Sequence, residues 1–211
     1  MNKITGFDEV IKELTYRVQA GSIVFVEGRK GSGKTTLLQA MISRFKGKKR
    51  VIYVDCSNVK SFNIEEIMQK RYGIFGRLMR LNPKNMVLLA DNVTELSKRN
   101  ITVLQYFFDH NYMASIIFTG ESYAKSKLPK SIKDRIGGRV VKVPKPTPAE
   151  AVEIAHQRFG WPVSDEIVKK IYKSSKSVAD FIANCVKVGE YAEKNRINEL
   201  DEKHLKEALR K

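Results

Sequence analysis

A short glycine-rich segment of the sequence has the composition and spacing that bind nucleotide phosphates. The range Gly28 to Thr35 has the sequence Gly-Arg-Lys-Gly-Ser-Gly-Lys-Thr and matches the pattern G-x-x-x-x-G-K-[ST]. Its glycines let the backbone curl so that successive N–H groups point at phosphate oxygens, while Lys34 bridges the β- and γ-phosphates and the Thr35 hydroxyl holds Mg²⁺. We therefore predict that ATP and Mg²⁺ bind at this phosphate-binding loop, through Gly28, Arg29, Lys30, Gly31, Ser32, Gly33, Lys34, Thr35 and Thr36.

Asp91, at the end of the run Met86 to Asp91, is the candidate carboxylate for the water shell of the metal. The run is apolar until its last residue, so a strand would deliver Asp91 at its carboxyl end, where ligands bind in open α/β sheets. The next residue is Asn92, whose amide cannot accept a proton as a carboxylate can. We therefore expect ATP hydrolysis to be slow. The other candidates for the base that orients water are Glu27, Glu95 and Glu121.

A framework of alternating helices and strands must bring these residues together. Short β-branched runs alternate with segments of helical periodicity, which indicates an α/β fold with a parallel five-stranded sheet covered by helices on both faces. The phosphate-binding loop falls between the first strand and the second helix, as its chemistry requires. The expected strands span 23–26, 51–55, 86–91, 114–119 and 139–143, and the expected helices span 7–18, 33–46, 63–80 and 97–109. A basic connector that contains Lys130, Lys133 and Arg135 is expected before the last strand.

The pattern changes after the fifth expected strand. Three prolines lie within residues 144–148, and such a segment cannot form a helix interior or a central strand. All expected elements beyond it are helices, over 148–159, 164–173, 177–195 and 201–210, with Ser164 and Asp201 as N-caps of the second and the last. We therefore expect a phosphate-binding α/β core over residues 1–144 and a small all-helical lid over residues 145–211.

Composition excludes several classes of protein and favours an anionic partner. The 211 residues are 42% hydrophobic, enough for a core, and 39 Lys and Arg against 23 Asp and Glu leave a net charge of +16. No apolar run approaches the roughly 20 residues that cross a bilayer, and no apolar segment typical of a secretory signal opens the chain. Cys56 and Cys185 cannot form a disulfide scaffold. We expect a cytoplasmic protein that has no membrane partner.

Two basic segments are candidates for contact with DNA. The range Lys70 to Arg80 interleaves basic residues with aromatics and glycines, a composition suited to holding phosphates and touching bases. A basic turn precedes the second expected strand. The candidate residues are Lys70, Arg71, Arg77, Arg80, Lys48, Lys49 and Arg50. Contacts of this kind go mainly to phosphates and carry little sequence preference, although a solvated basic face would have the same composition.

The order of these features resembles the AAA+ ATPases. Members of that family have the same features in the same order along the chain: the phosphate-binding loop, Asp91, the polar Thr119 at the end of the fourth strand, arginines before the fifth strand and a helical tail. Among AAA+ proteins the chain looks most like the initiator and helicase-loader group, or the transposition ATPases of MuB/IstB type. The sensor arginine expected near the start of the third lid helix is absent from the range 175–180, where Lys176 is the candidate to replace it.

The resemblance implies roles for two further residues. Thr119 would sense the γ-phosphate, and Arg135 would reach the nucleotide of a neighbouring subunit, with Arg139 as the second choice. Such a contact is head-to-tail, so the resemblance implies a ring or a filament rather than a two-fold dimer. It also implies a role in replication initiation, helicase loading or transposition, with a helicase, a transposase or another protein as partner.

Two other functions stay open at this stage. A signalling ATPase could use the nucleotide to fix a conformation and act on a protein partner without DNA, and the departure at Asn92 favours that alternative. A small-molecule kinase is the other alternative, but kinases of this type need a substrate lid inserted in the core. A GTPase is disfavoured because no N-K-x-D segment follows a strand.

Overall fold

The chain divides into two compact units. The computed structural model describes residues 5–47, 50–57, 66, 84–94, 96–160, 163–197 and 199–210. One unit, here called the sheet unit, comprises Glu9–Arg29 and Lys34–Val143. The other, here called the helical unit, comprises the segment that ends at Asp8, the range Lys30–Gly33 and the chain from Pro144 onward.

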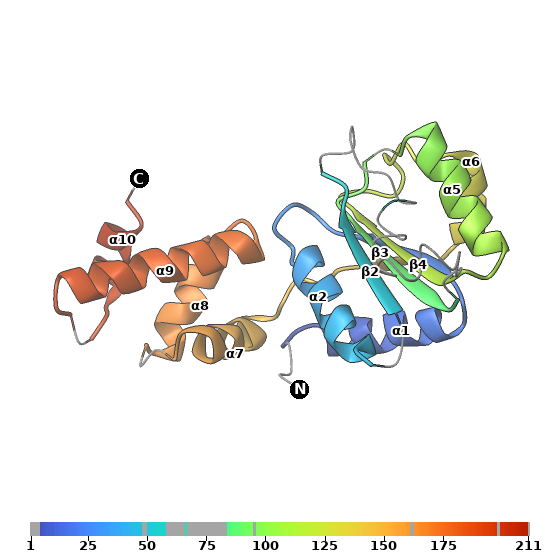
Figure 1. Ribbon diagram of the computed structural model, residues 1–211. Coiled ribbons are helices and arrows are strands. Elements are labelled where there is room, and N and C mark those ends of the chain that lie inside the picture. Colours follow the sequence, from blue (N-terminus) through green and yellow to red (C-terminus); the bar gives the residue numbers. More distant parts are fainter. Residues whose placement is uncertain are drawn as a thin grey trace. The chain divides into compact units, whose positions relative to one another are not determined.

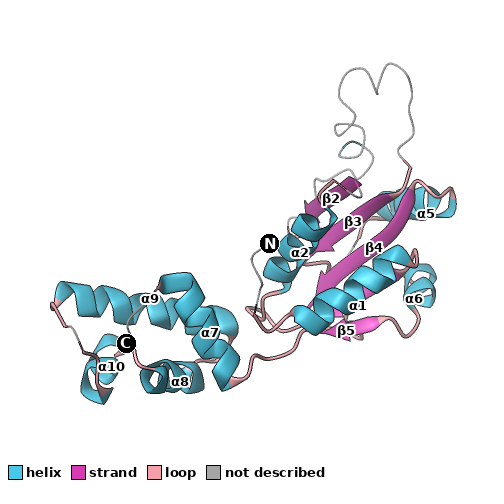
Figure 2. Ribbon diagram, turned by 90° about the horizontal axis from the view of Figure 1, so that it is seen from below, coloured by secondary structure: helices cyan, strands magenta, loops and turns pink. Residues whose placement is uncertain are grey.

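The sheet unit contains a parallel sheet of five strands in the order β2-β3-β4-β1-β5. Figure 2 shows β2, β3 and β4 side by side and β5 at the far edge of this sheet. The strands are β1 (Ile23–Glu27), β2 (Arg50–Asp55), β3 (Met86–Asp91), β4 (Met113–Gly120) and β5 (Val140–Lys142). The sequence pattern predicted both the parallel sheet and its flanking helices, and the structure confirms them. Because all strands run in the same direction, their carboxyl ends form one edge of the sheet, where Asp55 ends β2, Asp91 ends β3 and Thr119 is the next-to-last residue of β4.

Helices cover both faces of this sheet (Figure 1). Helices α1 (Asp8–Gln19) and α2 (Lys34–Phe45) lie on one face, and α5 (Lys98–Asp109) and α6 (Lys130–Ile136) lie on the other. Strand β3 is buried along its whole length, which explains its continuous apolar sequence before Asp91. The core under α5 and α6 includes Phe25, Leu88 and Phe118, all of them buried.

The basic connector before the last strand contains a helix, α6, that the sequence analysis did not predict. Ile132 and Ile136 stand four residues apart on α6, and both are buried against the sheet. This apolar pair holds one side of the segment on the core while its basic residues face outward, so helical structure forms despite the charge. The helix expected over 63–80 lies outside the described residues, apart from Glu66.

The helical unit packs helices α7 (Pro148–Phe159), α8 (Asp165–Ser174), α9 (Val178–Lys194) and α10 (Glu202–Ala208) around a core of their own. Phe181 and Tyr172 meet edge to face in this core, and the Tyr172 hydroxyl donates to the Pro146 carbonyl. Asp201 caps α10 as predicted, whereas Ser164 precedes α8 without a side-chain cap hydrogen bond. Among the described helices none combines the length and apolar character needed to span a lipid bilayer.

The cap of α7 allows a test of how the helical unit is stabilised. Thr147 Oγ1 accepts from the Glu150 N–H at 3.2 Å, and Glu150 Oε2 accepts from the Thr147 N–H at 2.7 Å. We expect Thr147→Ala to lower the free energy of unfolding by about 1 kcal/mol, measured by urea titration of the helical circular dichroism signal. Ser164→Ala removes an N-cap hydroxyl that makes no cap bond, so it should cost less than about 0.5 kcal/mol. Equal losses in both variants would contradict this account.

Candidate active site

The phosphate-binding loop joins the carboxyl end of β1 to the first turn of α2. The Gly28 N–H donates to the Gly120 carbonyl at 3.0 Å, which fixes the start of the loop beside the end of β4. Gly31 and Gly33 have φ of +77° and +94°, a backbone conformation that L side chains rarely adopt. A Cβ at Gly33 would come within 2.8 Å of the Phe7 ring, so a side chain there is excluded by space as well.

The remaining loop residues differ in their surroundings. Arg29, Lys30, Thr35 and Thr36 are exposed. The Gly31 carbonyl accepts from the Ala179 N–H at 3.0 Å within the helical unit. The Ser32 hydroxyl oxygen is buried and has no hydrogen-bond partner among the described residues. A buried hydroxyl without a partner is costly unless a ligand satisfies it, and a phosphate oxygen is an acceptor for it.

Lys34 is a buried ammonium group held by the loop itself. Its Nζ donates to the carbonyls of Gly28 at 2.7 Å and Arg29 at 3.1 Å. Burial lowers the pKa of Lys34, while the negative charges of Glu121 and Asp91 oppose that shift. A phosphate group close to Lys34 would add to this negative charge and favour the ammonium form.

Asp91 is the centre of a hydrogen-bonded cluster at the carboxyl edge of the sheet. Its Oδ2 accepts from the hydroxyls of Thr35 at 2.6 Å and Tyr53 at 3.0 Å. Its Oδ1 accepts from the Thr119 hydroxyl and from the Asn92 N–H, the latter at 3.0 Å. The structure thus brings together the two residues predicted to hold Mg²⁺, Thr35 and Asp91, and the predicted sensor, Thr119.

The donor set of this cluster fits Mg²⁺. Hydroxyl and carboxylate oxygens are the ligands that this ion prefers, and it commonly uses a few protein groups together with phosphate oxygens and water. The described residues contain no group of three or more His, Cys, Asp and Glu side chains that could hold a metal by themselves. A bound ion here would therefore rely on Thr35, Asp91 and the nucleotide phosphates.

Tyr53 is a member of the cluster that the sequence analysis missed. It lies on β2, and burial together with the charge and hydrogen bond of Asp91 raises the pKa of its phenol. The alternation of side chains along a strand places Tyr53 on the same face as Asp55, which was a usable signal. The pairing of Tyr53 with Asp91 required knowing that β2 and β3 are neighbours.

Asn92 occupies a backbone conformation that suits its residue type. Its φ of +55° lies in the left-handed region, where asparagine is tolerated and glutamate costs about 1–2 kcal/mol. Its N–H donates to the Thr119 hydroxyl at 3.0 Å, and its side-chain Nδ2 donates to Asp55 Oδ1 at 3.4 Å. Asn92 therefore links the ends of β2, β3 and β4.

The three glutamates proposed as substitutes for the base have different positions. Glu27 Oε2 accepts from the Tyr123 N–H at 2.9 Å and so holds the segment after β4. Glu121 is exposed, and its charge acts on Lys34. Glu95 lies outside the described residues.

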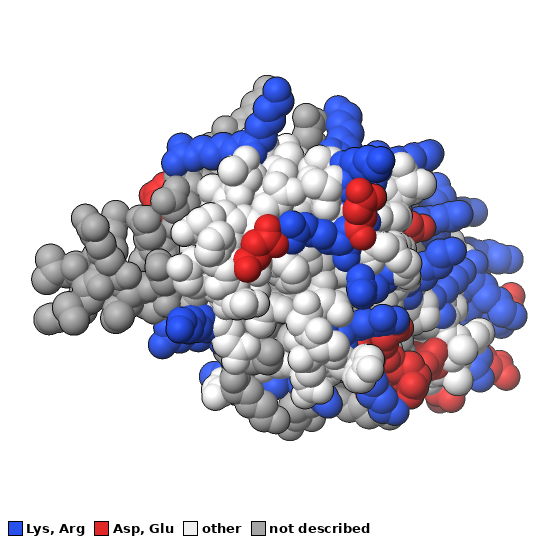
Figure 3. Space-filling model, turned by 90° about the vertical axis from the view of Figure 1, so that its right-hand side faces the viewer, with Lys and Arg blue, Asp and Glu red and all other residues white. Residues whose placement is uncertain are grey.

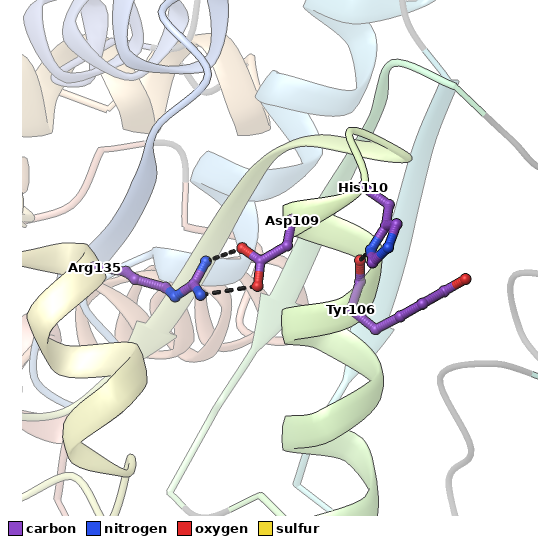
Figure 4. Close-up of polar contacts among 4 residues, drawn as sticks. All are labelled: Tyr106, Asp109, His110 and Arg135. Atoms are coloured by element: carbon purple, nitrogen blue, oxygen red, sulfur yellow. Dashed lines mark hydrogen bonds and ion pairs between the residues drawn. The ribbon is translucent and has the colours of Figure 1, made fainter.

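Arg135 lies on α6 and forms an ion pair with Asp109 at the end of α5 (Figure 4). Both terminal nitrogens take part, and the Nη2 to Oδ2 distance is 2.9 Å. The pair raises the pKa of Arg135 and lowers the pKa of Asp109, although both side chains are substantially exposed. Arg139, the second choice for the same role, donates to the carbonyls of Arg135 and Ile136.

Basic side chains predominate on one face of the molecule (Figure 3). Of the candidates for DNA contact, Arg50 is described, and it is exposed at the start of β2. It therefore lies at the opposite end of that strand from Asp55 and the phosphate-binding edge. The other candidates lie outside the described residues: Lys48, Lys49, Lys70, Arg71, Arg77 and Arg80.

Comparison with known proteins gives one family match and several weaker likenesses. A family model described as an AAA domain matches residues 20–147. The lipoprotein-releasing system ATP-binding protein LolD of Leptospira interrogans is 27% identical over 144 residues, which cover 66% of this chain and 54% of the relative. The chain spans about half or less of the length of the curated relatives it matches.

Solved structures share the fold at low sequence identity. Domain III of the Thermotoga maritima replication initiation protein DnaA superposes with a TM-score of 0.70 at 18% identity, covering 97% of this chain and 91% of that chain. The Aeropyrum pernix Orc1 protein, in a complex with DNA, gives a TM-score of 0.69 at 15% identity, covering 99% of this chain and 65% of that chain.

Proposed function

Because this chain belongs to the AAA+ ATPases, as the AAA-domain match over residues 20–147 shows, we propose that it binds ATP·Mg²⁺ at the phosphate-binding loop and hydrolyses it slowly. The observation that supports this most strongly is the convergence of Lys34, Thr35 and Asp91 at the carboxyl edge of the sheet. Lys34 supplies the charge for the phosphates, and Thr35 and Asp91 supply oxygens for the metal. Thr119, hydrogen-bonded to Asp91, would report the presence of the γ-phosphate.

Slow turnover follows from the residue after Asp91. Asn92 donates its side-chain amide to Asp55 and has no group that takes a proton from water. General base catalysis contributes about 10²–10⁴-fold to a rate, so a site without a carboxylate at this position gives up part of that factor. The residues that we propose to hold the nucleotide are those of the phosphate-binding loop and Asp91, so we expect ATP to stay bound long enough to stabilise an assembly.

Lys34→Ala tests the nucleotide site. Removal of the ammonium group should lower ATP affinity by about tenfold or more, as expected for a lost charge-assisted hydrogen bond, and turnover should collapse. Fluorescent-nucleotide titration and phosphate release are the measurements. Lys187→Ala, an exposed lysine of α9, is the matched control and should match the wild type. Unchanged ATP affinity and turnover in Lys34→Ala would contradict the assignment of the nucleotide site to this loop.

The second part of the proposal is head-to-tail self-association with ATP, in a ring or a filament, through Arg135. This residue is partly exposed, and its partner Asp109 is a surface carboxylate. Exposed ion pairs contribute only about 0–1 kcal/mol, so a neighbour's γ-phosphate, with its higher charge, can displace Asp109 from the guanidinium. The contact joins two different surfaces and cannot close a two-fold dimer.

Light scattering with and without ATP tests the role of Arg135. We expect ATP to raise the mass of the wild type well above that of a monomer and Arg135→Ala to abolish the increase. Asp109→Asn removes the competing carboxylate but keeps Arg135, so it should assemble at least as well as the wild type. A wild type that stays monomeric with ATP at every accessible concentration, with or without DNA, rules out this role.

The third part of the proposal is DNA binding without sequence preference, in the cytoplasm, during replication initiation, helicase loading or transposition. The net charge of +16 supports it, as does the fold shared with a replication initiation protein and with an Orc1 protein solved with DNA. Recruitment of a helicase or a transposase is part of this proposal. The candidate residues lie in the basic segments Lys48 to Arg50 and Lys70 to Arg80 of the sequence.

A salt titration tests DNA binding through these two basic segments. Affinity should fall by roughly 0.9 log unit per log unit of salt for each phosphate neutralised, and ATP should raise it because assembly multiplies a weak contact. The double charge reversal Arg71→Glu with Arg77→Glu should weaken binding to all sequences alike and flatten the salt slope. Lys187→Glu on α9 is the single-charge control. No salt-sensitive binding by the wild type would instead favour a nucleotide-switched ATPase that acts on a protein partner.

A further inference from the structure

Asp55 lies beside the candidate active site, at the end of the strand next to Asp91. Strands β2 and β3 pair in parallel with Asp55 opposite Asp91 in the register, and the Cys56 N–H donates to the Asp91 carbonyl at 2.8 Å. Both aspartates therefore stand at the carboxyl edge of the sheet. Asp91 is fully buried, whereas Asp55 is exposed to solvent.

The hydrogen bonds of Asp55 all fall on one of its two oxygens. Oδ1 accepts from the Ser57 N–H at 3.0 Å, the Ser57 hydroxyl at 2.5 Å and Asn92 Nδ2 at 3.4 Å. Oδ2 accepts no hydrogen bond from the described residues. One oxygen thus fixes the orientation of the carboxylate, and the other remains available to a water molecule on the solvent side.

The other carboxylates of the site are less suited to act on water. Both oxygens of Asp91 are occupied by donors, namely the hydroxyls of Thr35, Tyr53 and Thr119 and the Asn92 N–H. Glu27 is committed to the Tyr123 N–H. Glu121 is exposed, and its charge acts on Lys34, the group that binds the phosphates.

We propose that Asp55 is the carboxylate that orients and deprotonates the attacking water in ATP hydrolysis, and that Asn92 positions it. The inference rests on the ATPase function proposed above. In this step the Asp55 carboxylate accepts a proton from water while the water oxygen bonds to the γ-phosphorus. The bond from the γ-phosphorus to the bridging oxygen breaks, and its electron pair leaves with ADP. Asp55 then releases the proton to solvent, so ATP and water give ADP, inorganic phosphate and a proton.

This assignment accounts for the amide that follows Asp91. In the left-handed backbone at Asn92 a glutamate would be strained, but the asparagine amide can donate to Asp55 from there. The Asp55 carboxylate and the Asn92 amide thus provide one proton acceptor and one hydrogen-bond donor at the ends of two neighbouring strands. The acceptor lies on β2 rather than on β3.

Asp55→Asn is the central experiment, because asparagine can still accept from the Ser57 N–H and so keeps the turn after β2. Single-turnover hydrolysis of radiolabelled ATP should fall by about a hundredfold or more, while the dissociation constant for ATP changes less than about threefold. Asp134→Asn, an exposed aspartate of α6, should hydrolyse ATP at the wild-type rate. If Asp55→Asn hydrolyses within threefold of the wild type, or if Glu121→Gln loses more activity than Asp55→Asn, Asp55 is not the base.

The positioning role of Asn92 needs a separate readout. Asn92→Gly keeps the positive φ and removes the amide, so the rate constant should fall about tenfold with ATP affinity unchanged. If Asn92 acts through Asp55, the double variant should be no slower than Asp55→Asn alone. Multiplied losses would show that Asn92 acts independently of Asp55.

The failure of this inference differs from the failure of the proposed function. If the wild type binds and hydrolyses ATP, Lys34→Ala does not, and Asp55→Asn retains the rate, the ATPase function stands and the assignment of Asp55 falls. If neither the wild type nor Lys34→Ala binds ATP, both the ATPase function and the assignment of Asp55 are wrong.

Discussion

The fully buried carboxylate of Asp91 is the constraint on which the rest of the site depends. Burying a charge is costly unless hydrogen bonds or ions compensate it, and here the hydroxyls of Thr35, Tyr53 and Thr119 and the Asn92 N–H do so. Each donor comes from a different part of the sheet unit. The requirement to satisfy one group therefore fixes α2, β2 and β4 relative to the end of β3.

Parallel strands make this arrangement possible. All carboxyl ends meet at one edge, so Asp91 at the end of β3 and Thr119 near the end of β4 lie close together there, while the apolar residues before them form the core. The position of Asp55 opposite Asp91 is a consequence of this register and not of any local motif. The same edge holds the phosphate-binding loop, whose lysine is buried between loop carbonyls and acidic neighbours.

Charge has two separate roles in this molecule. The charges of Lys34 and Asp91 are buried and are held by directional hydrogen bonds. On the surface charge is abundant and weakly paired, and the ion pair between Arg135 and Asp109 is one example. Screened surface charge can change partners at little cost, which suits contacts with phosphates of a neighbouring subunit or of nucleic acid.

The sequence by itself determined the phosphate-binding loop, the strand that carries Asp91 and the alternating α/β order. Glycine spacing and apolar runs are local patterns, and each one indicates the backbone conformation of its own segment. They could therefore be interpreted without a structure. The cap of α10 by Asp201 was predictable for the same reason. The proposed site residues of the loop follow from the motif alone.

Only the tertiary structure decided which side chains meet. The contacts from Tyr53 to Asp91 and from Asn92 to Asp55 join residues far apart in the chain, and they depend on strand order and register. The positive φ of Asn92 and the ion pair of Arg135 likewise arise from packing. Helix α6 forms because the sheet provides an apolar surface for Ile132 and Ile136, and a basic sequence gives no direct sign of that surface. Local patterns specify elements, whereas the free energy of burying and pairing groups across elements specifies the site.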